Sequence, residues 1–271
     1  MKIYTVPIHY DVNVKGTENV IKACNSNGVS KLVFTSSTNV MMKWNGTTIE
    51  DVKNANESAP YSVDSPCSPY GQTKMIAEQR VLEANTKKGL LTCALRPPGI
   101  LGPRDKLVET VVKENGLPLG LMGFMGKQDW IYVENLVHAH FLAEKHLSPD
   151  STVGGQAFFV TNGETGYIGG DNLYIAVAKA LFRDHFNTSY DILRIPMSLL
   201  FLLANLIDKF HNLTRGRFIR GPFSKLTPIT IHYVTVDLKF DDSKARKLLG
   251  YHEIYTLPQG IARMGIYNNG N

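Results

Sequence analysis

Residues 68–78 read Ser-Pro-Tyr-Gly-Gln-Thr-Lys-Met-Ile-Ala-Glu and place Tyr70 and Lys74 four residues apart. On a helix, side chains at this spacing lie on one face, one turn apart. A phenol has a reference pKa of about 10, so it is a poor base at neutral pH, but a neighbouring ammonium favours the phenolate. The pair is therefore a candidate device for moving a proton to or from a hydroxyl or carbonyl group. The spacing alone also fits a solvated helix face, so the flanking segments are needed to choose between the two interpretations.

Two predicted strands flank this helix in the sequence. The apolar run Leu32-Val33-Phe34 is typical of a buried strand of a parallel sheet, and the hydroxyl cluster Thr35–Thr38 follows it. A second strand begins near Leu91 and enters the loop Arg96-Pro97-Pro98-Gly99-Ile100. Open α/β sheets bind ligands at the carboxyl ends of their strands, so we expect the three segments to meet in one crevice. For the hydroxyl cluster alone, a strand-end turn is an equally good interpretation.

The sequence resembles the extended short-chain dehydrogenase/reductases, specifically the 3β-hydroxysteroid dehydrogenase family and its sterol-4α-carboxylate 3-dehydrogenase (decarboxylating) branch. The likeness is weakest between about residues 165 and 235. It is carried by Asn13–Val20, Thr35-Ser36-Ser37, the Tyr70/Lys74 helix, Arg96–Asp105, Asp129–His140 and Ala245–Tyr251.

The resemblance implies oxidation of a 3β-hydroxysteroid or sterol with NAD or NADP, NAD being favoured. In that reaction Tyr70 takes the hydroxyl proton, Ser37 binds the same oxygen, and Lys74 lowers the pKa of Tyr70 and binds the nicotinamide ribose. The implied catalytic residues are thus Ser37, Tyr70 and Lys74, and the implied cofactor contacts are Tyr70, Lys74, Pro97, Pro98, Gly99 and Ile100. A 4α-carboxylate on the substrate would leave as carbon dioxide after oxidation.

The family's glycine-rich nucleotide loop does not occur before Asn13. A βαβ unit takes roughly 30 residues, so two or three units would place about 70 to 90 residues before Ser37, whereas 36 precede it. The glycines at 120, 123 and 126 have the family's spacing but precede an extended run, Trp130–Val133, and are interpreted as a turn. We therefore expect an α/β fold with a partial Rossmann-type parallel sheet that lacks its first βαβ units.

The predicted organisation has a truncated nucleotide-binding domain with the catalytic residues over 1–104 and a smaller mixed substrate-binding lobe over 105–271. Residues 156–164 are expected to return to the main sheet. The predicted helices are 10–27, 70–86, 106–115, 134–146 and 242–249, with an irregular excursion over 41–66 and an extended pair around 235–237. Asn13 and Thr17 are interpreted as helix-start and packing positions.

Composition is that of an ordinary globular chain, with 43% apolar and 20% charged residues. The three cysteines lack the spacing of a disulfide framework or metal site, which favours a reducing compartment. His138 and His140 are two residues apart and face different ways on a helix, so no metal site is expected. The net charge of +5 comes without any nucleic-acid motif, and no nucleic-acid partner is expected.

An apolar segment from Ile195 to Ile207 is too short to span a bilayer, which needs about 20 apolar residues. It is followed by Lys209, Arg215, Arg217, Arg220 and Lys225, with Asp208 the single acidic residue among them. This pattern fits either peripheral membrane contact over 195–225 or a helix that covers the core or a substrate cleft. The expected location is intracellular, at the endoplasmic reticulum or lipid-droplet surface, and otherwise cytoplasmic. Assembly into a homodimer is left open.

Two other functions stay open on the sequence. One is a non-catalytic truncated paralogue or fragment that keeps a lipid-binding surface. The other is a different extended short-chain dehydrogenase, such as a nucleotide-sugar epimerase or a flavonoid-type reductase. The apolar segment 197–207 argues against a sugar-nucleotide substrate.

Overall fold

The computed structural model describes residues 7–46, 48–103, 105, 126–163, 167–168, 171–172, 197–214 and 227–268. The helical elements are α1 (Pro7–Tyr10), the π-helical turn η1 (Asp11–Lys15), α2 (Gly16–Ser26), η2 (Thr38–Val40), α3 (Pro69–Glu83), η3 (Lys87–Gly89), α6 (Val133–His146), α8 (Met197–Leu213), α9 (Pro228–Thr235), α10 (Ser243–Leu249) and α11 (Leu257–Asn268). The strands are β1 (Lys31–Thr35), β2 (Val52–Ala55), β3 (Leu91–Arg96), β4 (Gly99–Leu101), β5 (Trp130–Tyr132), β6 (Ala157–Phe159), β7 (Tyr167–Ile168), β8 (Asp171–Asn172) and β9 (Leu238–Phe240).

The chain divides into two compact units. The first takes residues 1–101, 129–164 and 239–257, and the second takes 102–128, 165–238 and 258–271. The first segment of the sheet unit thus ends three residues before the predicted boundary at 104, and two later segments rejoin it.

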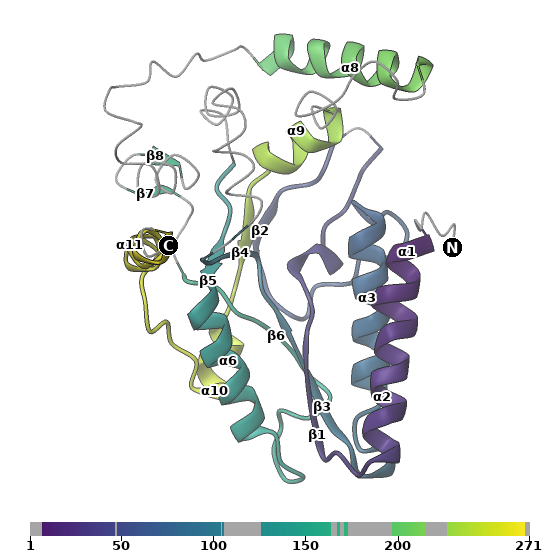
Figure 1. Ribbon diagram of the computed structural model, residues 1–271, viewed down its shortest axis with the longest axis vertical. Coiled ribbons are helices and arrows are strands. Elements are labelled where there is room, and N and C mark those ends of the chain that lie inside the picture. The colour runs from purple at the N-terminus through teal and green to yellow at the C-terminus, as the bar shows by residue number, and fades with distance from the viewer. Residues whose placement is uncertain are drawn as a thin grey trace. The chain divides into compact units, whose positions relative to one another are not determined.

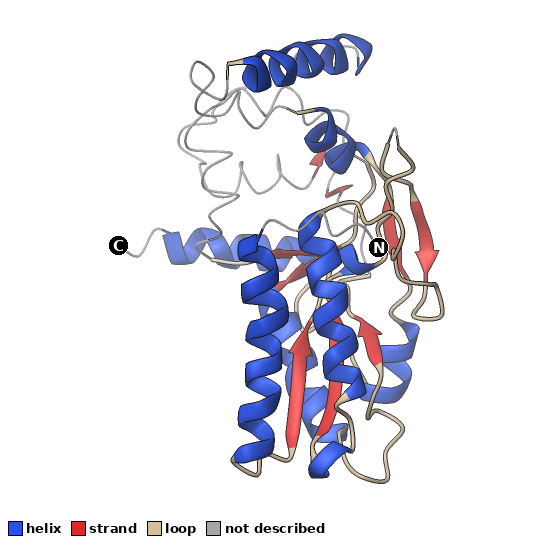
Figure 2. Cartoon of the chain, turned by 90° about the vertical axis from the view of Figure 1, so that its right-hand side faces the viewer, coloured by secondary structure: helices blue, strands red, loops and turns tan. Residues whose placement is uncertain are grey.

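A parallel sheet in the order β1-β3-β6 lies at the centre of the first unit, with Leu32 opposite Thr92 and Ala94 opposite Ala157. Helices α2 and α3 cover one face, and α6 and α10 cover the other (Figure 1). Figure 2 shows α2 and α3 side by side in front of the strands. Parallel strands with helices on both faces confirm the predicted α/β class.

The core of this unit explains why the strands are nearly continuous apolar runs. Both faces of the sheet are covered, so alternation with polar residues is not needed. The buried cluster between the sheet and the α6/α10 layer comprises Cys93, Leu95, Ile131, Leu136, Ala139, Ala143, Leu147, Val153, Phe158, Val160, Ala245, Leu249 and Tyr251.

Local signals in the sequence set the start of α3. The Ser68 side chain accepts a hydrogen bond of 3.1 Å from the Gly71 backbone N–H, and Pro69 occupies the first helical turn. A serine cap and an early proline satisfy or remove the backbone donors that a helix leaves unpaired at its start. The predicted helix over 70–86 is confirmed, although it begins at Pro69 and ends at Glu83.

The helices predicted over 10–27, 134–146 and 242–249 are present as α1/η1/α2, α6 and α10. The prediction of an extended pair around 235–237 is wrong at Thr235. Thr235 is the last residue of α9, where its hydroxyl donates to the carbonyl of Ile231, and the strand begins only at Leu238. The excursion over 41–66 is mostly irregular but contains β2, which pairs with β9. The helix predicted over 106–115 lies outside the described residues.

In the second unit, α8 packs on α9 through a small buried cluster of Leu200, Ala204 and Ile231. Leucines on another side of α8 stay exposed, among them Leu199, Leu202, Leu206 and Leu213. Within the described residues, no helix has the length and apolar character needed to cross a membrane.

Candidate active site

The carboxyl end of β1 lies against the loop that follows β3. The Ser36 backbone N–H donates to the Leu95 carbonyl at 2.7 Å, and the Thr38 N–H donates to the Pro97 carbonyl at 3.0 Å. Ser37 has an extended backbone and caps η2, its Oγ accepting from the Asn39 N–H at 3.2 Å. The predicted strand-end turn is therefore present, and the hydroxyl cluster that forms it also contacts the Pro97 loop.

Tyr70 reaches this strand end through close contact between α3 and η2. A Cβ atom on Gly71 would lie 2.6 Å from the Asn39 carbonyl oxygen, a distance that real Cβ atoms do not adopt. Glycine at position 71 thus allows the helix to approach the turn. The Tyr70 side chain lies close enough to that of Ser37 to influence the Tyr70 pKa, and its ring lies edge-on to His9 with centroids 6.3 Å apart. Tyr70 is 39% exposed, so the phenol is accessible from solvent.

Lys74 lies one turn further along α3. Its ammonium donates to the Thr35 carbonyl at 2.6 Å and lies 4.1 Å from the centroid of the Phe34 ring. Both partners belong to β1, so α3 contributes its tyrosine and its lysine to the same strand end. The structure thereby brings together Ser37, Tyr70 and Lys74.

The pKa values of the pair differ from the sequence-based expectation. Partial burial raises the pKa of Tyr70, and the nearby Ser37 side chain opposes this rise. The expected lowering of the Tyr70 pKa by Lys74 is not seen, because the ammonium is held by the Thr35 carbonyl. Burial lowers the pKa of Lys74 to about 8, while the charge of Glu78 acts in the opposite direction. Lys74 therefore changes its charge within a mildly alkaline range.

A buried ion pair anchors α3 to β3 beneath the site. Arg96 donates to both carboxylate oxygens of Glu78, the shortest distance being 2.6 Å, and both side chains are almost fully buried. The Tyr61 hydroxyl donates to the same carboxylate at 2.6 Å. Because a buried charge without a partner is very unfavourable, this network fixes the helix relative to the strand.

Pro97 and Pro98 connect β3 with β4, which begins with Gly99 and Ile100. Pro97 is buried and its carbonyl is used by Thr38, whereas Gly99 and Ile100 are exposed. A Cβ on Gly99 would lie 2.5 Å from the Trp130 ring, so glycine is needed there for packing against β5. The structure shows this packing role for Gly99, and the cofactor contacts of the segment stay a prediction.

The sequence did not assign three residues of this region to the site: Asn13, Thr35 and His140. Asn13 lies in the π-helical turn η1 and donates to Thr73 Oγ1 at 2.9 Å, between Tyr70 and Lys74. Thr35 offers its carbonyl to Lys74, and its hydroxyl contacts His140 Nε2 at 2.7 Å. Single π-helical turns often mark functional positions, but they leave no clear sequence pattern.

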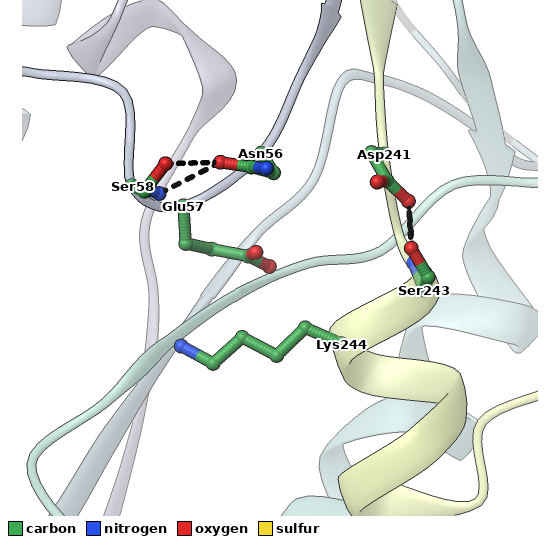
Figure 3. Close-up of a pocket in the computed structure, with 6 residues that line it drawn as sticks. All are labelled: Asn56, Glu57, Ser58, Asp241, Ser243 and Lys244. Atoms are coloured by element: carbon green, nitrogen blue, oxygen red, sulfur yellow. Dashed lines mark hydrogen bonds between the residues drawn. The ribbon is translucent and has the colours of Figure 1, made fainter.

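A separate pocket of about 460 Å³ lies beside the end of β6 and is lined by Asn56, Glu57, Ser58, Asp241, Ser243 and Lys244 (Figure 3). Glu57 accepts from the Phe159 backbone N–H at 2.7 Å, and Lys244 donates to the Ala157 carbonyl at 2.8 Å. Burial raises the pKa of Glu57 and lowers that of Lys244. Both charged groups are thus engaged in holding β6, and none of the three predicted catalytic residues lines this pocket.

Metal-binding residues are not clustered in the described ranges, where no three His, Cys, Asp or Glu side chains are placed to share an ion. His138 packs edge-on to His252 with ring centroids 5.0 Å apart, and His140 contacts β1. Gly126, the last residue of the glycine-rich run, packs so closely against the Val236 backbone that a Cβ would clash, while residues 120–125 lie outside the described ranges.

A parallel α/β sheet with a hydroxyl cluster, a tyrosine and a lysine at one strand end defines the Rossmann-type short-chain dehydrogenase/reductase class. Solved structures share this fold. The crystal structure of gox2253 matches with a TM-score of 0.66 at 21% identity, covering 100% of this chain and 76% of that chain. The dTDP-glucose 4,6-dehydratase from Bacillus anthracis, in complex with NAD, matches with a TM-score of 0.60 at 16% identity, covering 97% and 69%.

Residues 1–181 match the 3-beta hydroxysteroid dehydrogenase/isomerase family, and the chain belongs to this family. It is 34% identical to 3beta-hydroxysteroid-dehydrogenase/decarboxylase isoform 1 of Arabidopsis thaliana, with 94% of this chain and 57% of that protein covered. It is 35% identical to sterol-4-alpha-carboxylate 3-dehydrogenase, decarboxylating, of Mus musculus, with 94% and 68% covered. The chain thus spans a little over half to two thirds of these relatives.

Proposed function

We propose that this chain carries the catalytic residues of a sterol dehydrogenase that oxidises a 3β-hydroxyl group with NAD(P), acting on a 4α-carboxysterol that then loses carbon dioxide. The observation that carries the proposal is the meeting of Ser37, Tyr70 and Lys74 at the end of β1, where Gly71 lets α3 contact η2 and the Lys74 ammonium donates to the Thr35 carbonyl at 2.6 Å. The names of the relatives in Arabidopsis and mouse support the sterol and the decarboxylation.

The roles of the three side chains follow from their positions. Tyr70 acts as a general base in its phenolate form: its own proton first passes to solvent, and it then takes the proton of the substrate hydroxyl. Burial raises the pKa of Tyr70, which opposes that first loss of a proton. The Ser37 hydroxyl lies at the same strand end and hydrogen-bonds the same substrate oxygen, which positions it. Oxidation of the hydroxyl beside the carboxylate yields a β-keto acid. The bond to the carboxylate carbon then breaks, carbon dioxide leaves, and the electron pair of that bond remains on the enolate.

The residues fit the nicotinamide end of the cofactor. When bound, the nicotinamide accepts the hydride that leaves the carbinol carbon. Lys74 has a cationic head with three N–H donors, of which one is used by the Thr35 carbonyl, so the others can bind ribose hydroxyls. The exposed Gly99 and Ile100 lie on the strand that follows the Pro97 loop. Among the described residues, no glycine-rich turn links a strand to a helix in the way that dinucleotide phosphates require.

The test is a direct assay with a 4α-carboxy-3β-hydroxysterol and either NAD or NADP, following reduced nicotinamide fluorescence and the 3-keto product by mass spectrometry. We expect Tyr70→Phe to lower the turnover rate by roughly a hundredfold or more, the usual range for an acid–base group. In a longer active relative, the same substitution should have the same effect. Retention of more than a few per cent of activity would contradict the assignment.

Two outcomes would favour the other functions. Calorimetry that detects no saturable binding of either dinucleotide would favour a non-catalytic paralogue or fragment that keeps a lipid-binding surface. Turnover of a nucleotide sugar or flavonoid in place of a sterol would indicate another extended short-chain dehydrogenase. Sterol-dependent reduction of the dinucleotide distinguishes the proposed function from both.

We further propose that α8 mediates peripheral contact with a membrane, in line with an endoplasmic reticulum or lipid-droplet location. Five leucines on α8 fall within an arc of about 100° of the helix circumference, and each is at least 39% exposed: Leu199, Leu202, Leu203, Leu206 and Leu213. Leu200 and Ala204, which pack on α9, lie on another side. The basic residues that follow α8 in the sequence add attraction to anionic lipid. Formation of a homodimer stays a prediction, to be measured by analytical ultracentrifugation.

A further inference from the structure

Thr35 is contacted from both faces of the sheet. Its backbone carbonyl accepts the Lys74 ammonium of α3 at 2.6 Å, and its Oγ1 lies 2.7 Å from Nε2 of His140 on α6. These two helices cover opposite faces of the sheet (Figure 1). The last residue of β1 is therefore held between a lysine on one side and a histidine on the other.

The ladder geometry explains why the Thr35 carbonyl is available to Lys74. In a parallel pair, alternate residues direct their backbone groups to the same neighbouring strand. The even-numbered residues on this strand face β3, since Ser30 accepts from Leu91 and Ser36 donates to Leu95. The odd-numbered residues of β1 therefore direct their backbone N–H and C=O groups to the opposite edge. Within the described part of the chain no strand pairs along that edge.

The protonation of His140 follows from its second contact. Its Nδ1 lies 2.8 Å from the Leu136 carbonyl oxygen, which can only accept, so Nδ1 carries a proton. The other ring nitrogen, Nε2, lies 2.7 Å from the Thr35 hydroxyl and forms a hydrogen bond with it. The helix backbone thus orients the ring, and the ring in turn orients Thr35.

We propose that His140 is a positioning residue of the candidate active site, which acts through Thr35 to keep the Thr35 carbonyl on the Lys74 ammonium. The proposal rests on the proposed function only for the catalytic meaning of Lys74. A second histidine on the same helix provides a matched control. His146 makes the same bond from Nδ1 to the carbonyl four residues earlier, at 2.9 Å from Leu142, and no hydrogen bond from it to β1 is seen among the described residues.

The test measures exchange of the Lys74 ammonium protons with solvent by 15N NMR on the full chain, at a pH below 8, where Lys74 is charged. We expect exchange to accelerate roughly three- to tenfold in His140→Phe and in Thr35→Val, the range for losing one hydrogen bond. The double variant should exchange no faster than either single variant, because both remove the same contact. His146→Phe should match the parent chain, and His140→Gln should restore slow exchange.

Parent-like exchange in both His140→Phe and Thr35→Val would overturn the proposal, as would effects of the two substitutions that add. Thr35→Val keeps a β-branched side chain suited to a strand, so the question can be decided even if His140→Phe does not fold. The measurement needs neither cofactor nor substrate. A chain without dehydrogenase activity would therefore contradict the proposed function and leave this result standing.

Discussion

Asp129 is a nearly fully buried carboxylate directly before β5, and its oxygen accepts from the Phe240 backbone N–H at 2.8 Å. Burial raises its pKa to about 6, more than the Phe240 N–H and the charge of Lys239 lower it, and the charge of Asp242 adds to the rise. The fold therefore favours the neutral side chain. A group with a raised folded pKa binds its proton more tightly when folded, so its contribution to stability falls as pH rises through about 6.

We accordingly predict that Asp129→Asn stabilises the chain at neutral pH, because the amide oxygen still accepts from Phe240 and no charge is buried. The free energy of unfolding in urea should rise by about 2–3 kcal/mol at neutral pH, and the gain should shrink as pH falls from about 6 toward 4. Asp241→Asn serves as the control of opposite sign, since hydrogen bonds from Ser243 lower the pKa of Asp241. Loss of stability in Asp129→Asn at neutral pH would contradict the prediction.

The candidate site illustrates which residue contacts a sequence can predict. Ser37, Tyr70 and Lys74 come together as expected, because strand ends of a parallel sheet meet at one edge and a four-residue spacing fixes one helix face. The partner of Lys74 was not predictable. It is a backbone carbonyl, which every residue has, and its availability depends on which edge of β1 is paired. The raised pKa of Tyr70 likewise depends on burial and not on neighbours in sequence.

At the scale of elements, the approach of α3 to η2 depends on one missing side chain. We predict that Gly71→Ala separates α3 from the Asn39 carbonyl and costs about 1–3 kcal/mol, the range for an overpacked contact. It should also move the Tyr70 side chain away from Ser37 and reduce turnover. Gly16→Ala is the matched control, because a Cβ there would lie 3.7 Å from its nearest neighbour, the Asp11 carbonyl oxygen. In a helix, alanine is favoured over glycine by about 0.5–1 kcal/mol, so this control should be stabilised.

Thermal unfolding of the two alanine variants checks the contrast directly. If the thermal midpoint changed in the same direction in both variants, the close approach of α3 to η2 would have no structural importance. A parent-like Tyr70 environment in the NMR spectrum of Gly71→Ala would lead to the same conclusion. Because both glycines lie in helices, the difference in propensity is the same and only the neighbouring carbonyl distinguishes them.

The ion pair between α3 and β3 gives a second prediction at this scale. Glu78→Gln keeps the shape of the side chain but leaves the buried Arg96 guanidinium without a counter-charge, which should cost about 3–5 kcal/mol. Glu83→Gln removes one of two acidic partners of Arg80 on the exposed side of the same helix, where the ion pair is 3.3 Å long, and should change stability by less than about 1 kcal/mol. Equal losses in urea unfolding would contradict an anchoring role for the buried pair.

Helix and strand types were largely predictable, whereas some boundaries were not. The apolar runs of β1 and β3 and the cap at Ser68 are strong local signals. The sequence around Thr235 is β-branched and reads as extended, yet it ends α9, because Ile231 packs against α8 and this tertiary contact outweighs local propensity. The brief strand β2 within 41–66 exists through pairing with β9, nearly two hundred residues away in the numbering.

At the scale of the whole molecule, the exposed leucines of α8 set its surface apart from that of an ordinary helix. An apolar stripe on a surface helix that does not pack on a core is typical of a membrane-interface segment. We predict that the chain sediments with vesicles containing anionic lipid and that binding weakens at high salt. The double variant Leu202→Glu/Leu206→Glu should lower the partition coefficient by tenfold or more, because burying each leucine contributes about 1.5–3 kcal/mol.

Phe141→Glu on α6 is the control for a general loss of surface apolarity, since Phe141 is 69% exposed and lies in the other compact unit. It should leave vesicle binding unchanged. If α8 instead covers the protein's own core or substrate cleft, the double variant should lower the thermal midpoint or weaken sterol binding while vesicle binding stays as in the parent. The two interpretations of α8 thus differ in which measurement changes, and parent-like vesicle binding by the double variant would exclude α8 as the membrane contact.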